Sequence, residues 1–258
     1  MKLFIVAVDE PIYLNPYVSG VIDRGGADVV GVGIYQPPRL RRTRTRVRRA
    51  ISHALLAPLV FAPTDLAATV WSRLCAAIGR PSRNSLATIC AARGVPCTTV
   101  ATANAPEFAA RLRELDVDVL LHQTPEILRG EVLRAPKLGI LNRHLSMLPA
   151  YRGAWPLFWQ FVNAESRLGI TIHLVDEGID TGPVLAQMAV ERRSGETLAS
   201  AHKRLFAHAV SLTAEALEAL GRGDVGARTN TGSTTPCYRT PSPFDVLTFM
   251  FSPRRRSL

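Results

Sequence analysis

Short runs of consecutive apolar residues recur along this chain, and they constrain its fold more than any other feature. In the first part of the chain the expected strands are Leu3–Val8, Asp28–Tyr35, Val95–Val100, Val117–His122 and Leu138–Asn142, and several of them are apolar on consecutive positions. Strands that are apolar on consecutive positions are typical of a parallel sheet with both faces covered. Helical spacing separates the runs at Tyr17–Arg24 and Ala105–Leu115, and a shorter helix is expected over Pro125–Leu133. This alternation predicts an α/β fold with ligands beyond the carboxyl ends of the strands.

The composition suits a folded chain of one or two domains. Its 258 residues are 47% hydrophobic, which excludes disorder along the whole length. Lysine and arginine number 31 against 21 acidic residues, a net charge of +10. Nearly all of this charge is arginine, and genome composition produces such a bias as readily as nucleic-acid binding does. The four cysteines lack the spacing of a metal site, so we expect a reduced, cytoplasmic protein without a metal.

Residues 37–85 interrupt the alternation. The segment Arg39–Arg49 holds seven arginines in eleven residues, and an Ala/Leu-rich pair of expected helices follows. We interpret the region as an arginine-rich helical insertion. Three roles remain open: a solvated arginine face, a lid over an anionic substrate, and weak contact with a membrane surface through residues 39–71. The longest apolar stretch, Ile51–Trp71, contains two prolines and an aspartate, which disfavours a transmembrane segment.

The second half of the chain continues with strands and one long helix. Apolar residues alternate over Leu168–Val175, so Thr171 and His173 share one face of that expected strand. Pro183–Val190 is expected to be another strand, and Gly195–Gly221 a long amphipathic helix. From Gly223 the sequence is rich in Thr, Ser, Pro and Gly, which favours a docked extension with a frayed end.

Polar side chains capable of chemistry gather after two of the expected strands. Asn142 and His144 stand two residues apart at a strand end, so they project from the same face. An amide beside an imidazole in this place is suited to stabilise an oxyanion. Three carboxylates follow a later strand within five residues, at Asp176, Glu177 and Asp180. One of them can orient His144 and accept a proton.

The ordered motifs around these residues resemble one known family. They are Asn142-x-His144-x-Ser146-x-Leu148-Pro149-x-Tyr151-Arg152-Gly153, then Gly169-x-Thr171-x-His173, then Asp180-Thr181-Gly182-Pro183. This combination resembles the folate-dependent formyltransferases, which include glycinamide ribonucleotide, methionyl-tRNA and amino-sugar N-formyltransferases. The resemblance is strong over roughly residues 86–190, weaker over residues 1–36 and absent over the arginine-rich insertion.

The resemblance implies a fold, a reaction and a catalytic trio. The fold would be the formyltransferase fold, a Rossmann-like, mostly parallel sheet with helices on both faces. Residues 1–222 would form the catalytic domain, with the insertion at 37–85, and residues 223–258 a short C-terminal extension. The reaction would move a formyl group from N10-formyltetrahydrofolate to a primary amine. By matching position, Asn142 and His144 would donate hydrogen bonds to the oxyanion, and Asp180 would hold the imidazole and take the amine proton.

Further residues are assigned by the same resemblance. The folate-binding residues would be Thr124, Pro125, Glu126, Ile127 and Leu128 in one loop, and Val175, Asp176, Glu177, Gly178 and Ile179 in another. Ser146, Arg152, Thr171 and His173 would contact the substrate or support the catalytic residues.

Departures from the family narrow the expected acceptor. The acidic segment Val8–Ile12 replaces the glycine- and serine-rich loop of the glycinamide ribonucleotide enzymes, which disfavours their substrate. About 35 residues follow Gly223, too few for the C-terminal domain of the tRNA enzymes, so tRNA is not expected. Arg143 stands where an aliphatic residue is common, and it either faces solvent or indicates an unusual acceptor.

A small-molecule amine therefore remains as the partner of the folate. The leading acceptor is a nucleotide-linked amino sugar, because arginines suit a pyrophosphate. An amine of an amino acid or of a lipid-like compound is the second choice. Two other functions stay open: a formyltetrahydrofolate hydrolase, and a basic nucleic-acid-binding protein that has lost catalysis. A homodimer is a further partner hypothesis.

Overall fold

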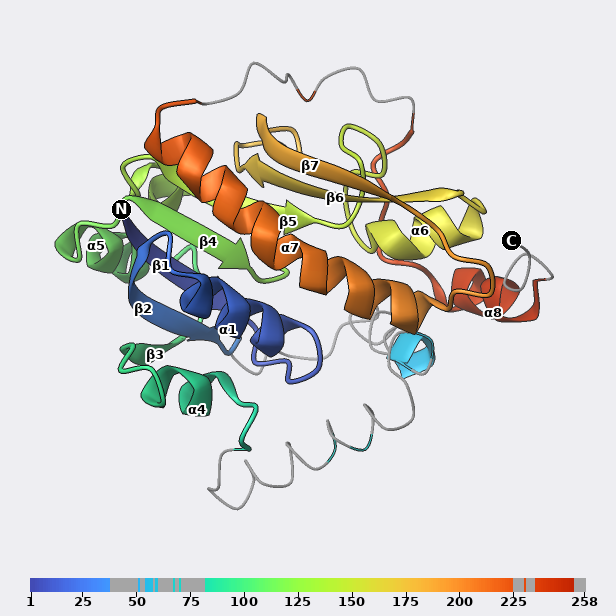
Figure 1. Cartoon of the computed structure of the whole chain (residues 1–258), viewed down its shortest axis with the longest axis horizontal. Coiled ribbons are helices and arrows are strands. Elements are labelled where there is room, and N and C mark those ends of the chain that lie inside the picture. Colours follow the sequence, from blue (N-terminus) through green and yellow to red (C-terminus); the bar gives the residue numbers. More distant parts are fainter. Residues whose placement is uncertain are drawn as a thin grey trace.

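Seven strands in the described part of the chain form one twisted sheet (Figure 1). This computed structural model describes residues 1–37, 82–224 and 235–252, together with residues 51, 54–57, 59, 67, 70 and 230. The strands are β1 Lys2–Ala7, β2 Asp28–Tyr35, β3 Cys97–Val100, β4 Val119–Gln123, β5 Gly139–His144, β6 Arg167–Leu174 and β7 Val184–Glu191. Their order is β3-β2-β1-β4-β5-β6-β7. The first five are parallel, whereas β6 is antiparallel to both of its neighbours, β5 and β7, which confirms the expected mostly parallel α/β sheet.

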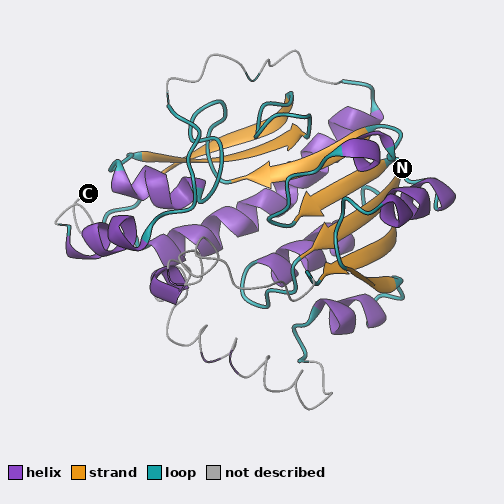
Figure 2. Ribbon diagram, turned by 180° about the vertical axis from the view of Figure 1, so that it is seen from behind, coloured by secondary structure: helices purple, strands orange, loops and turns teal. Residues whose placement is uncertain are grey.

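Helices cover both faces of this sheet (Figure 2). They are α1 Leu14–Arg24, α4 Leu86–Ala91, α5 Pro106–Glu114, the 3₁₀ helix η1 Gly130–Arg134, α6 Pro156–Val162, α7 Leu198–Gly221 and α8 Pro243–Phe251. Alternate residues of β1, β4 and β5 supply two separate cores. Ile5 and Leu141 pack with residues of α1, α6 and α7, whereas Val6 and Ile140 pack with residues of α5 and η1. Because both faces are buried, the strands are apolar at consecutive positions.

Three expected helices differ from those observed. Helix α1 begins at Leu14, three residues before the expected Tyr17. Helix α7 begins at Leu198 because Thr197 caps it by accepting a hydrogen bond from the Ser200 N–H. The helix expected over Pro125–Leu133 is wrong in its first half, and only η1 is helical. The cause is Glu126, whose carboxylate accepts hydrogen bonds from the Thr102 hydroxyl and the Ala103 N–H, both at 2.7 Å. These long-range bonds hold residues 125–129 as a loop.

The described part of the C-terminal segment docks onto helix α6 and the loop after β5. Helix α8 buries Val246 and Phe249, and the Phe249 ring lies 5.3 Å from that of Phe158. Tyr238 stacks between the rings of Tyr151 and Trp159, at centroid distances of 5.3 and 5.0 Å. The arginine run at residues 39–49 lies outside the described residues. Among those that are described, no helix is long and apolar enough to span a bilayer.

Candidate active site

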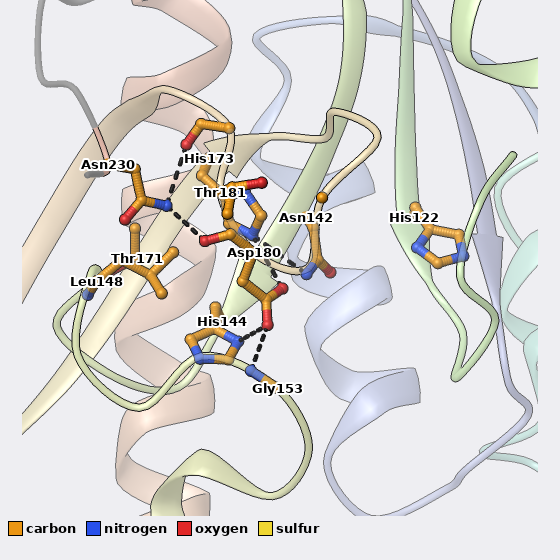
Figure 3. Close-up of polar contacts among 12 residues, drawn as sticks. His122, Asn142, His144, Leu148, Gly153, Thr171, His173, Asp180, Thr181 and Asn230 are labelled. Carbon is orange, nitrogen blue, oxygen red and sulfur yellow. Dashed lines mark hydrogen bonds and ion pairs between the residues drawn. The ribbon is translucent and has the colours of Figure 1, made fainter. Parts of the chain in front are cut away.

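Three polar residues lie in a row across the carboxyl-terminal edge of the sheet. The strand register pairs His122 of β4 with Asn142 of β5, and Asn142 with His173 of β6. Paired residues share a face, so the three side chains point the same way. His144 follows at the end of β5 (Figure 3). Asn142 and His144 were expected together at a strand end, and the structure adds His173 beside Asn142.

The loop between β6 and β7 brings Asp180 to this row. Asp176 shapes the loop by accepting hydrogen bonds from the Gly178 N–H and the Thr181 hydroxyl. The loop residue Asp180 has a positive φ of 51°. Its main-chain carbonyl accepts a 2.6 Å hydrogen bond from the buried Asn230 amide. These contacts fix the direction of the Asp180 side chain.

The Asp180 carboxylate joins the two imidazoles. Oδ2 accepts a 2.7 Å hydrogen bond from the Gly153 N–H and lies 3.5 Å from Nδ1 of His144. Oδ1 lies 3.6 Å from Nε2 of His173 (Figure 3). Asn142 completes the cluster, with its amide nitrogen 3.3 Å from the same His173 nitrogen. The structure therefore brings together the residues assigned to catalysis, Asn142, His144 and Asp180.

The environment keeps Asp180 ionised. Burial by itself raises the pKa of the Asp180 carboxyl, but the imidazoles and the Gly153 N–H outweigh it and lower that pKa to about 2. Burial lowers the pKa of the His144 imidazole, and the Asp180 carboxylate offsets only part of that shift. The cluster thus combines a carboxylate with an imidazole that burial favours in its neutral form.

Hydrogen bonds assign the proton of neutral His144. Nε2 lies 2.9 Å from the Tyr151 carbonyl oxygen, which can only accept, so the proton belongs on Nε2. The lone pair of neutral His144 is then on Nδ1, directed towards Asp180. His144 consequently has no N–H left for an oxyanion unless it is protonated. In the neutral cluster, the Asn142 amide is the donor that faces the cavity.

A cavity of about 80 Å³ opens beside the cluster. Among the residues assigned to folate, those that line it are Glu126, Ile127, Leu128, Val175, Asp176, Gly178 and Ile179. Thr124, Pro125 and Glu177 are not among its lining residues. Thr124 instead lies with its hydroxyl 2.8 Å from Nε2 of His122. The two loops predicted from the sequence therefore face one cavity, although three of their residues do not line it.

The remaining assigned residues support the strand ends. Thr171 donates a 2.6 Å hydrogen bond to the Ser146 carbonyl and accepts one from the Leu148 N–H. The Ser146 hydroxyl donates to the Ala150 carbonyl. Arg152 lines neither this cavity nor the next one, and its carbonyl accepts from the Tyr238 N–H. Ser146, Thr171 and Arg152 thus hold the loop after β5, whereas His173 alone of this group lines the first cavity.

A second cavity, of about 170 Å³, reaches the cluster at His144. Its lining residues are Arg143, His144, Leu145, Trp155, Pro156, Leu157, Phe158, His202 and Phe206. Leu145, Leu157 and Phe158 belong to the core on the α7 face, whereas Leu128 of the first cavity belongs to the core on the α5 face. The two cavities therefore approach the cluster from opposite faces of the sheet.

Sequence reasoning missed four contributors to this region. They are His122 and the Gly153 N–H, and, from distant segments, Asn230 and His202. The strand pattern could have indicated His122, since it ends β4 beside Asn142. Burial lowers the pKa of His122 to about 4, so this ring is neutral at pH 7. Asn230 carries no local signal, because its contact with Asp180 spans 50 positions.

Within the described residues, no group of three His, Cys, Asp or Glu side chains is arranged to hold a metal.

Solved structures of formyltransferases have the same architecture as this chain. Glycinamide ribonucleotide transformylase 1 from Symbiobacterium toebii aligns with a TM-score of 0.61 and 20% identity, over 88% of this chain and 92% of that one. The N-formyltransferase from Helicobacter canadensis, solved with folinic acid and dTDP-3-aminofucose, aligns with a TM-score of 0.57 and 14% identity, over 93% and 71%. These likenesses define the class of fold.

The sequence itself gives the family. Residues 75–217 match the formyl transferase family model. Methionyl-tRNA formyltransferase from Citrifermentans bemidjiense is 34% identical over 146 residues, which are 56% of this chain and 46% of that protein. The chain belongs to the formyl transferase family, as the motifs around Asn142, His144 and Asp180 predicted. It spans about half the length of the curated relatives it matches.

Proposed function

We propose that this chain transfers a formyl group from N10-formyltetrahydrofolate to a primary amine. The observation that carries the proposal is the contact of Asp180, His144 and His173 around Asn142, with a cavity on either side. A site open on two faces suits a reaction between two substrates. Membership of the formyl transferase family supports the same reaction.

The proposed chemistry begins with attack of the neutral amine on the formyl carbon. A C–N bond forms, the carbonyl oxygen becomes an oxyanion, and the attacking nitrogen becomes cationic. The Asn142 amide donates to the oxyanion, and loss of such a donor typically costs about 2.7–4 kcal/mol of barrier. A protonated His144 carries a hydrogen on Nδ1, and this hydrogen points to the Asp180 carboxylate, so Asn142 is the proposed donor to the oxyanion.

Asp180 is the proposed acceptor of the amine proton. Its carboxylate lines the first cavity, and Nδ1 of His144 lies 3.5 Å away with its lone pair towards it. The pair therefore offers two adjacent places for one proton. Return of that proton to N10 breaks the bond between N10 and the formyl carbon, which releases tetrahydrofolate and the formamide.

The first cavity is the proposed folate site. Apolar side chains of Ile127, Leu128 and Val175 line it beside the main chain of Gly178. Such a mixture suits the flat, hydrogen-bonding ring of a reduced pterin. The structural neighbour from Helicobacter canadensis, solved with folinic acid, gives independent support.

The acceptor is the finer part of the proposal. A nucleotide-linked amino sugar, expected from the sequence, draws support from the neighbour solved with dTDP-3-aminofucose. The methionyl-tRNA formyltransferases among the relatives keep an aminoacyl-tRNA among the acceptors to be tested. A hydrolase would need the same cluster with water as acceptor. Whichever acceptor is used, we propose that the protein itself is cytoplasmic.

The test incubates the purified full chain with N10-formyltetrahydrofolate and a panel of amines. Absorbance follows loss of the folate formyl group, and mass spectrometry identifies the products. We expect a formamide from at least one amine, with the rate lost in His144→Ala and kept in His208→Ala, a control on the exposed face of α7. Release of formate without any formamide would assign a hydrolase instead, and no loss of the formyl group would refute both reactions.

A further inference from the structure

The second cavity combines an apolar wall with an arginine. Trp155, Phe158 and Phe206 supply aromatic surface, and Leu145 and Leu157 supply aliphatic surface. Arg143 is the only lysine or arginine among the residues that the structure places in its lining. The cavity also reaches His144, so a molecule bound there lies beside the proposed catalytic cluster.

Arg143 comes from the same strand as the cluster. It lies between Asn142 and His144 on β5, so the pleat directs its side chain to the α7 face. Its guanidinium carbon lies 3.9 Å from the centre of the Phe206 ring and 5.1 Å from that of Tyr17. Stacking on two aromatic rings holds the planar group in one position.

The guanidinium has few protein partners. Nε donates a 3.0 Å hydrogen bond to the Gln123 side chain, which is neutral. None of the ion pairs found within the described residues includes Arg143. Burial lowers its pKa to about 10, so the group is still a cation at pH 7. The Glu10 carboxylate acts on Arg143 only from a distance and forms no ion pair with it. Among the described residues, this half-buried cation therefore has no direct anionic partner, and a bound anion would supply one.

The neighbouring loop disfavours a phosphate as that anion. Backbone N–H groups at a helix start commonly bind phosphate. Here the Glu10 carboxylate already accepts from the N–H groups of Ile12, Tyr13 and Leu14, at 2.7, 2.9 and 3.0 Å. That end of α1 therefore presents a negative charge rather than free donors. One guanidinium beside an acidic loop matches a single negative charge better than a pyrophosphate.

Resting on the proposed function, we propose that Arg143 determines acceptor specificity by pairing with a carboxylate of the amine substrate. The acceptor is then a small amino carboxylate whose apolar or aromatic body packs against Trp155, Phe158 and Phe206, with its amine towards His144 and Asp180. A guanidinium can bind a carboxylate through two parallel hydrogen bonds, which fixes orientation as well as charge.

Binding tests this inference without any turnover. Isothermal titration compares 3-phenylpropanoate with 3-phenylpropanamide, which have the same body but differ in charge. We expect the wild-type chain to bind the acid about 10- to 100-fold more tightly, the usual effect of a charge-assisted hydrogen bond. Arg143→Met should remove this preference and Arg143→Lys should keep part of it, whereas Arg222→Met, at an exposed position, should leave it intact. Equal binding of acid and amide to the wild-type chain would overturn the inference.

Turnover separates this inference from the proposed function. Initial rates compare phenylalanine and leucine with their amides, and with a nucleotide-linked amino sugar. We expect kcat/KM to favour the amino acids, and the ratio of acid to amide to fall about 10- to 100-fold in Arg143→Met. If the amides or the amino sugar are formylated as well as the acids, the acceptor inference fails while formyl transfer stands. If no amine is formylated although the acid binds, the proposed function fails instead.

Discussion

Replacement of Asp180 by asparagine separates the charge of the cluster from its shape. Asparagine keeps the size of the side chain, and its carbonyl oxygen can still accept from the Gly153 N–H, as Asp180 does at 2.7 Å. It lacks the negative charge that faces His144 and His173 at 3.5 and 3.6 Å. The substitution therefore tests electrostatics and proton transfer with little change in packing.

The expected loss of stability follows from the pKa of Asp180. That pKa falls from an ordinary value of 3.8 to about 2, a difference of roughly 1.8 units, and each unit is about 1.36 kcal/mol. The ionised side chain therefore stabilises the fold by about 2 kcal/mol above pH 3.8, and this contribution is lost as the pH falls through 2. Because asparagine resembles the protonated form, Asp180→Asn should cost at most about 2 kcal/mol at pH 7, where neutral His144 contributes less charge than protonated His144 does.

Activity should fall far more than stability. Removal of a positioned general base typically costs about 10²- to 10⁴-fold in rate. Urea unfolding at pH 7 measures the stability, and steady-state formylation of the best amine measures kcat. Asp28→Asn, an exposed position at the start of β2, is the matched control and should change neither quantity. A variant with full kcat, or one more stable than the wild type at pH 7, would refute the role of an ionised Asp180.

Two further predictions concern the surroundings of the cluster. Burial lowers the pKa of His122 to about 4 and that of His202 to about 3, so the unfolded chain binds protons first as the pH drops below 6.5. Each ring should thus cost about 2 kcal/mol of stability between pH 6.5 and pH 5, and urea midpoints should depend less on pH in His122→Asn and in His202→Gln. Equal pH dependence in wild type and variants would contradict this. A Cβ at Gly153 would overlap the Tyr238 carbonyl oxygen at a positive φ of 98°, so Gly153→Ala should lower both Tm and kcat, and an unchanged Tm would contradict the docking of Tyr238.

The features that could be predicted from the sequence are those that depend on local pattern along a single strand. The strands were predicted because both of their faces are buried, and Asn142 and His144 because alternation along one strand orders them. Residues 125–129 could not be predicted, since the Glu126 carboxylate holds them through bonds to residues 102 and 103. The protonated nitrogen of His144 was equally hidden, because it depends on the Tyr151 carbonyl in the following loop.

The pleat of β5 explains how one strand can serve two substrates. Asn142 faces the cavity on the α5 side, and Arg143, the next residue, faces the cavity on the α7 side. His144 ends the strand, contacts the second cavity and lies 3.5 Å from Asp180 of the first. Three consecutive residues thus contact the proposed donor site, the proposed acceptor site and the proton acceptor between them. A shift of one residue in the β5 register would exchange these faces, so the pairing of Asn142 with both His122 and His173 also maintains the separation of the two substrates.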